Sequence, residues 1–174
     1  VDAPDDQPGE FGADGAWGVG LVERNFRVRV DETVETDVYL PLATVDRTAE
    51  GPFPVVVSVH GGLVAPEQYR WLNAHVASRG FVVLAPHHGA DLAIFQTGNG
   101  REILEVARQV SQRGGSPMDG MLDDGPALAM GHSLGGVVAS KLWLHAPQEF
   151  SHLALLASYP AEGDDYNREG EADV

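Results

Sequence analysis

The fold class is decided by one stretch of the chain, Ala127-Leu128-Ala129-Met130-Gly131-His132-Ser133-Leu134-Gly135-Gly136. An apolar run breaks into Gly-His-Ser-Leu-Gly-Gly and continues as a second apolar segment, residues 137–144. This pattern predicts a buried strand, a sharp turn and a helix. Glycines on either side of Ser133 would let strand and helix pass close together, which leaves the serine hydroxyl exposed as a candidate nucleophile.

The Gly-X-Ser-X-Gly pattern within this stretch is weak evidence when taken alone. From the composition of the chain it is expected by chance roughly 0.1 times. Its flanks add weight, because a strand before it and an amphipathic helix after it are the context in which such a serine is a nucleophile. The alternative is a glycine-rich structural turn with an incidental serine.

Composition predicts one globular domain without a membrane-spanning segment. The chain has 174 residues, 43% of them apolar, and no apolar run approaches eighteen residues. It has no cysteine, which excludes disulfides, thiolate metal ligands and cysteine nucleophiles. We expect no cofactor and no metal, since the carboxylates show no spacing typical of a calcium loop.

The formal net charge of −15 is concentrated near the two ends of the chain. We expect residues 1–18 and 161–174 to be acidic tails that flank a core over residues 19–160. This distribution argues against nucleic acid and anionic membranes as partners. The chain starts with Val-Asp-Ala rather than methionine, from which we expect a secreted or periplasmic protein.

Hydrophobic patterning predicts an α/β fold: a mostly parallel twisted sheet, helices on both faces and an N-terminal antiparallel hairpin. The hairpin is expected from two alternating segments, residues 26–30 and 34–40. Apolar runs without alternation predict strands buried on both faces. The expected strands are 55–59, 81–85, 127–130 and 152–157, and the expected helices are 66–79, 101–113 and 134–144.

Four motifs in order carry a resemblance to a known family: His60-Gly61-Gly62, Ala77 to Pro86, Gly131 to Gly136, and Leu155 to Pro160. Together they make residues 53–160 resemble the α/β-hydrolase superfamily. The similarity is greatest to the compact, lidless bacterial esterases related to dienelactone hydrolases, platelet-activating-factor acetylhydrolases and polyester hydrolases.

The resemblance implies roles for individual residues. Ser133 would be the nucleophile, and the backbone N–H groups of Gly62 and Leu134 would form the oxyanion hole, with Leu63 as the second choice after Gly62. Two such donors stabilise the tetrahedral intermediate by about 3 kcal/mol each. Gly61 and Gly62 have an alternative interpretation as a tight turn without this role.

The acid and the histidine of a catalytic triad are not evident in the sequence. In the family they follow the serine after later strands, but the last histidine here is His152, inside a predicted strand. By the family pattern the chain therefore resembles a truncated member that lacks its C-terminal part. The candidates for residues that line the site or substitute for the triad are His60, His87, His88, His132, Asp91, Asp164 and Asp165.

Three function classes follow from these observations. The first is a serine-dependent carboxylic-ester hydrolase, which acts on a small-molecule or polymer ester. The second is a non-catalytic scaffold or binding protein that retains the turn, and the third is an acyltransferase, lactonase or thioesterase of the same fold. Without later strands, residues 152–157 would form an exposed apolar edge, so we also expect an oligomer or a second chain that covers it.

Overall fold

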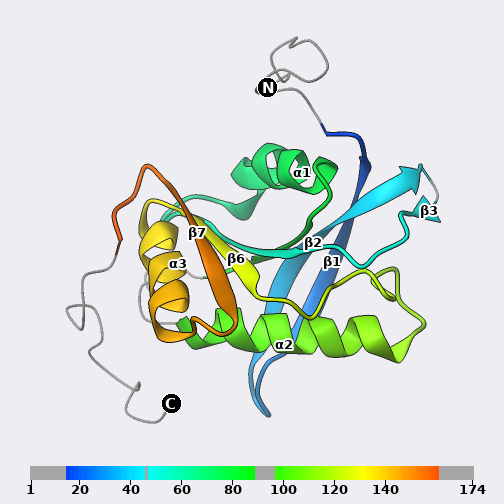
Figure 1. Cartoon of the computed structure of the whole chain (residues 1–174). Helices are drawn as coiled ribbons and strands as arrows, with labels where there is room; N and C mark the ends of the chain where they lie inside the picture. The colour runs from blue at the N-terminus through cyan, green and yellow to red at the C-terminus, as the bar shows by residue number, and fades with distance from the viewer. Residues whose placement is uncertain (1–14, 46, 89–96, 161–174) are drawn as a thin grey trace.

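The computed structural model describes residues 15–45, 47–88 and 97–160. A seven-stranded sheet with the strand order β1-β2-β5-β4-β6-β7 forms the centre of the molecule, and β3 pairs with β2 (Figure 1). The strands are β1 (Gly18–Arg27), β2 (Thr33–Thr44), β3 (Arg47–Thr48), β4 (Val55–Val59), β5 (Val82–Pro86), β6 (Ala127–His132) and β7 (Phe150–Leu156). The helices are η1 (Pro66–Tyr69), α1 (Arg70–Ser78), α2 (Thr97–Arg113) and α3 (Leu134–His145).

The predicted fold class is confirmed. Strands β5, β4, β6 and β7 are parallel, whereas β2 pairs antiparallel with β1, β3 and β5. Within the described sheet β2 alone therefore runs against the other strands. All residues of β4 and β5 are buried, as their unbroken apolar sequences predict.

Helices cover both faces of the sheet, and β4 shows how the two faces are separated. Val55, Val57 and Val59 belong to one hydrophobic cluster with residues of α2 and α3. Val56 belongs to the other cluster, together with Ala77 of α1. Because side chains alternate along a strand, a sheet with a helix layer on each side must be apolar at every position of its central strands. Figure 1 shows α1 on one side of the sheet and α2 and α3 on the other.

The N-terminal hairpin is present, but its first strand was predicted too late in the chain. β1 begins at Gly18 and ends at Arg27, so Val28 and Val30 lie in the turn instead of the strand. The glycines at the start of β1 hide this strand from a pattern search, because they lack the side chains that show alternation. Gly20 is suited to its place, since a Cβ there would lie 3.2 Å from Leu42 on the paired strand β2.

The carboxyl ends of β4, β5 and β6 meet at one edge of the sheet, where ligands bind in folds of this kind. β4 and β6 are neighbours there, with Val59 paired to Gly131. α3 leads back to β7 through residues 146–149 at the opposite edge, where the start of β7 pairs with the start of β6. No helix of the described residues has the length and apolar character needed to cross a membrane.

Candidate functional site

Ser133 occupies the sharp turn between β6 and α3, and its backbone is strained. Its φ of 52° and ψ of −123° are those of the first central position of a type II′ turn, a position dominated by glycine. A residue with a Cβ adopts such a conformation at a cost of about 1–3 kcal/mol. The Ser133 side chain is exposed, so the strained turn presents the hydroxyl to solvent.

Three glycines make this turn sterically possible. A Cβ at Gly131 would lie 2.2 Å from the carbonyl oxygen of Gly135, and a Cβ at Gly135 would lie 2.2 Å from the carbonyl oxygen of Val59. A Cβ at Gly136 would lie 2.4 Å from the side chain of Ser158. Strand and helix therefore pass as closely as the sequence pattern predicts.

Hydrogen bonds from the end of β7 hold the backbone of Ser133. The Ser133 N–H donates to the carbonyl oxygen of Leu156 at 3.1 Å. The Ser158 hydroxyl donates to the carbonyl oxygen of Ser133 at 2.6 Å. Sequence reasoning missed Ser158 as a supporting residue, and only its place in the Leu155 to Pro160 motif hinted at a role.

The two predicted oxyanion donors lie on segments that contact the turn. Leu134 is the first residue of α3, so no carbonyl of its own helix accepts its N–H, and the helix dipole adds positive potential there. On the other side, a Cβ at Gly61 would lie 2.9 Å from Nδ1 of His132, which places the loop after β4 directly beside the turn. Leu63 in this loop has a φ of 59° and is 92% exposed.

Tyr69 of η1 links this loop to the turn, and sequence reasoning missed it. Its hydroxyl oxygen accepts the Gly61 N–H at 3.0 Å and lies 2.7 Å from Nδ1 of His132. The structure therefore places the His132 ring on the side of Tyr69 and the loop. Tyr69 carries no sequence signal of its own, since a tyrosine in a predicted helix is most simply interpreted as a packing residue.

His60 and His88 form a stacked pair in which each ring has a structural partner. Their ring centroids lie 3.5 Å apart. His60 Nδ1 donates to the carbonyl oxygen of Gly61, and His60 Nε2 accepts the backbone N–H of His88. His88 Nε2 donates to the carbonyl oxygen of His60. Burial lowers the pKa of His60, which favours the neutral ring that this arrangement requires.

His87 faces β2, on the far side of β5 from β4 and β6. Its Nε2 lies 3.3 Å from Oδ1 of Asp37, and its Nδ1 lies 3.8 Å from Oε2 of Glu35. The 3.3 Å contact is close enough for an ion pair but is not aligned as a hydrogen bond. Asp37 is buried. The pKa of Tyr39 is raised to about 12, first by the burial of Tyr39 itself and second by the negative charge of Asp37. The histidines that end β4 and β5 are thus occupied by neighbours other than Ser133.

The structure brings together Ser133, Leu134, His132 and the loop at Gly61 and Gly62, but it shows no base bonded to the nucleophile. Among residues 15–45, 47–88 and 97–160, no histidine or carboxylate forms a hydrogen bond with the Ser133 hydroxyl. The predicted substitutes Asp91, Asp164 and Asp165 lie outside the described residues. In the described part of the chain no three histidine or carboxylate side chains are grouped as metal ligands would be.

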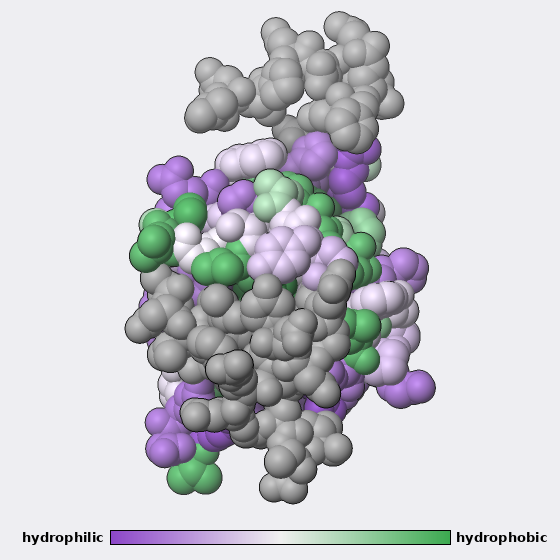
Figure 2. Space-filling model, turned by 90° about the vertical axis from the view of Figure 1, so that its left-hand side faces the viewer, coloured by the Kyte–Doolittle hydropathy of each residue, from purple (hydrophilic) through white to green (hydrophobic). Residues whose placement is uncertain are grey.

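Part of the described surface on this side of the molecule is apolar. Figure 2 views the molecule from the side to which the carboxyl edge of the sheet points, and it shows apolar residues interspersed with weakly polar ones on the upper part of that face. Leu63, next to a candidate oxyanion donor, and Tyr159, next to Ser158, are both exposed.

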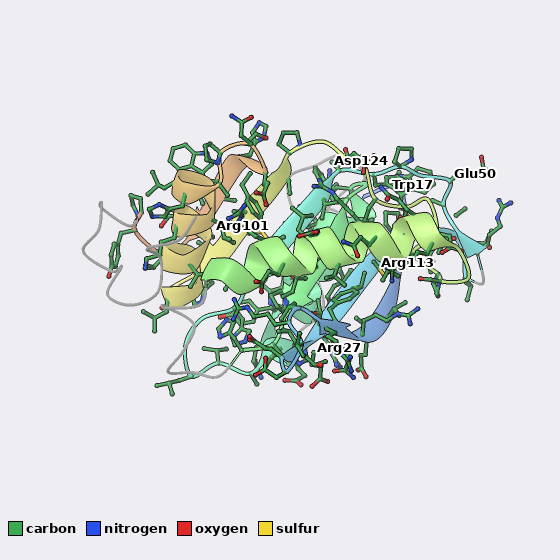
Figure 3. All side chains as sticks on the ribbon, turned by 90° about the horizontal axis from the view of Figure 1, so that it is seen from below. Trp17, Arg27, Glu50, Arg101, Arg113 and Asp124 are labelled. Atoms are coloured by element: carbon green, nitrogen blue, oxygen red, sulfur yellow. The ribbon has the colours of Figure 1, made fainter. Side chains whose placement is uncertain are left out.

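A depression lies along α2, lined by residues other than those of the serine turn. Its lining includes Arg101 and Arg108 of α2, together with Asp124 and Glu149. Figure 3 shows Arg101 on the helix and Asp124 outside it. The charges there pair locally, since Arg101 contacts both carboxylate oxygens of Glu149 and Arg108 donates to backbone carbonyls. Ser133 does not line this depression.

The parallel sheet, the two helix layers and the strained serine turn together define an α/β-hydrolase-like protein. The family model named chlorophyllase matches residues 19–174, and the chain belongs to this family. Membership confirms the superfamily predicted from the sequence and indicates a hydrolase of the α/β-hydrolase type. No curated protein matches the chain.

Proposed function

We propose that the chain is a serine-dependent carboxylic-ester hydrolase that acts through an acyl-enzyme on Ser133. The observation that carries this proposal is the backbone of Ser133, an exposed residue at φ 52° and ψ −123° directly before α3. Strain of this size persists where the surrounding structure enforces it, and such positions cluster at active sites. Membership in a hydrolase family supports the same conclusion.

In the proposed reaction the Ser133 hydroxyl attacks the carbonyl carbon of the ester while a base takes its proton. The carbonyl oxygen becomes an oxyanion, which accepts hydrogen bonds from the N–H groups of Leu134 and Gly62. Collapse of this intermediate breaks the bond to the alcohol, which leaves with a proton. Water then attacks the acyl-enzyme by the same steps and releases the carboxylic acid. We assign no base, because the described residues offer none in contact with Ser133.

The substrate is proposed as an ester with apolar groups that reaches an open site. The exposed Leu63 and Tyr159 support an accessible, partly apolar rim. A compact esterase without a lid, as the sequence resemblance suggests, would have such a site. The name of the family points to chlorophyll, which is itself an ester, so chlorophyll belongs in a panel of test substrates.

The test is the intact mass of the full chain before and after treatment with a fluorophosphonate, with Ser133→Ala as the control. One adduct on the wild-type chain and none on the variant is the expected result. Absence of an adduct on the wild-type chain would contradict the proposal and would favour a non-catalytic scaffold. Rates on matched oxygen esters, lactones and thioesters, with and without an alcohol acceptor, then separate an esterase from a lactonase, a thioesterase and an acyltransferase.

A further inference from the structure

We infer that Tyr69 is a positioning residue that fixes the oxyanion loop, residues 61–63, relative to the turn that bears Ser133. This inference rests on the proposed function, because it assigns the residue that orients one of the two proposed oxyanion donors. Tyr69 itself is not proposed to touch the substrate. Its hydroxyl group joins two segments that are far apart in sequence and adjacent in space, Gly61 after β4 and His132 at the end of β6.

The directions of the two hydrogen bonds follow from the chemistry of the groups. The amide of Gly61 is a donor only, so the Tyr69 oxygen accepts from it at 3.0 Å. The phenolic proton is then available for Nδ1 of His132 at 2.7 Å, a short distance typical of a strong bond from a hydroxyl. We assign Nδ1 of His132 as the acceptor of this proton, which places the ring proton on Nε2.

The three groups fit against one another without spare room. A Cβ on Gly61 would lie 2.9 Å from the Tyr69 hydroxyl and 2.9 Å from Nδ1 of His132. Gly61 is buried, while Tyr69 and His132 are each partly buried. The loop is thus held against the bridge both by hydrogen bonds and by contact.

The loop needs such a bridge because its own sequence does not define its conformation. Gly61 and Gly62 have a wide choice of φ and ψ, and Leu63 adopts a φ of 59° that a leucine rarely populates. Tyr69 fixes the His60–Gly61 peptide, which directly precedes the Gly61–Gly62 peptide that carries the Gly62 N–H. The carbonyl oxygen of that second peptide accepts from His60 Nδ1, so the two bonds together orient the Gly62 N–H. Donors to an oxyanion have to be held within about 0.5 Å of their productive position, so a loop freed from Tyr69 would lose transition-state stabilisation.

The test removes the hydroxyl alone with Tyr69→Phe in the full chain. We expect the rate of fluorophosphonate labelling and the kcat on an activated ester to fall about tenfold, with KM changed less than twofold, because the loss falls on the transition state. Tyr39→Phe is the matched control, since it removes a buried tyrosine hydroxyl from β2, away from the turn. It should leave the labelling rate unchanged even where it lowers the unfolding temperature.

The acceptor side of the bridge supplies a rescue experiment. In His132→Asn the side-chain amide oxygen takes the place of Nδ1, whereas His132→Leu removes the acceptor. We expect His132→Asn to be labelled several-fold faster than His132→Leu. The double variant with Tyr69→Phe and His132→Leu should be labelled no more slowly than the slower of the two single variants. Equal rates for Asn and Leu, or multiplicative losses in the double variant, would overturn the inference.

Hydrogen exchange of the Gly61 amide measures the bridge directly. Tyr69→Phe should speed exchange of this amide about tenfold or more, because its acceptor is gone. Labelling at the wild-type rate, or unchanged exchange at Gly61, overturns the role of Tyr69 and leaves the proposed function intact. If the wild-type chain itself does not label, the proposed function fails and the positioning role fails with it.

Discussion

Replacing Ser133 with glycine tests whether the nucleophile turn stores strain. A serine at φ 52° and ψ −123° costs about 1–3 kcal/mol relative to an unstrained residue, whereas glycine adopts this conformation freely. Glycine also gives the unfolded chain more freedom, which costs about 0.5–1 kcal/mol. The difference predicts that Ser133→Gly raises the free energy of unfolding by about 1 kcal/mol, even though it removes the candidate nucleophile.

Ser133→Ala is the matched control, because it removes the same hydroxyl but keeps the Cβ that causes the strain. The Ser133 side chain is exposed, and its backbone bonds to Leu156 and Ser158 remain in both variants. We expect the alanine variant to melt within about 1 °C of the wild-type chain and the glycine variant about 2–4 °C higher. Differential scanning calorimetry measures both values. A glycine variant no more stable than the alanine variant would refute the strain argument.

Three further predictions concern packing and protonation. Gly135→Ala should lower the free energy of unfolding by about 3 kcal/mol or more, because its Cβ would lie 2.2 Å from the carbonyl oxygen of Val59. The control Gly125→Ala should lower it by less than about 0.5 kcal/mol in the same denaturant titration. Similar losses for the two variants would contradict the close passage of strand and helix. Burial lowers the pKa of His60 from 6.5, so the unfolded chain takes up the proton first and stability should fall as the pH drops below about 6.5. The unfolding midpoint should therefore fall less between pH 7 and pH 5 in His60→Asn than in the wild-type chain. An equal fall in the two proteins would contradict this effect of burial on His60. The pKa of Tyr39 is raised to about 12, so stability should decline as the pH rises above about 10. In a titration of absorbance at 295 nm, Tyr39→Phe should lack one tyrosine that ionises late in the wild-type chain. If the missing tyrosine ionises at the ordinary pH instead, burial and Asp37 do not act on Tyr39 as described.

The candidate site shows where prediction from sequence stops. The glycines of the turn could be recognised because their spacing around Ser133 is local and fixed by sterics. His87 could not be placed, because its preference for Asp37 on β2 depends on which strand pairs with β5. Similarly, Tyr69 has a role only because η1 places its hydroxyl between Gly61 and His132.

The sequence by itself determined the order of elements, the two-faced burial of the central strands and the strand–turn–helix at Ser133. Each follows from short-range rules: apolar runs in β4 and β5, helical periodicity, and glycines where backbones approach. The start of β1 escaped these rules, because its glycines show no alternation.

Only the tertiary structure decided the partners of the histidines and the residues that support the turn. His60 stacks on His88, His132 meets Tyr69, and Ser158 bonds to the backbone of Ser133. These contacts join segments from different strands and helices, so no local pattern encodes them. They arise because parallel strands bring their carboxyl ends to one edge of the sheet, where side chains distant in sequence compete for the same few hydrogen-bonding groups.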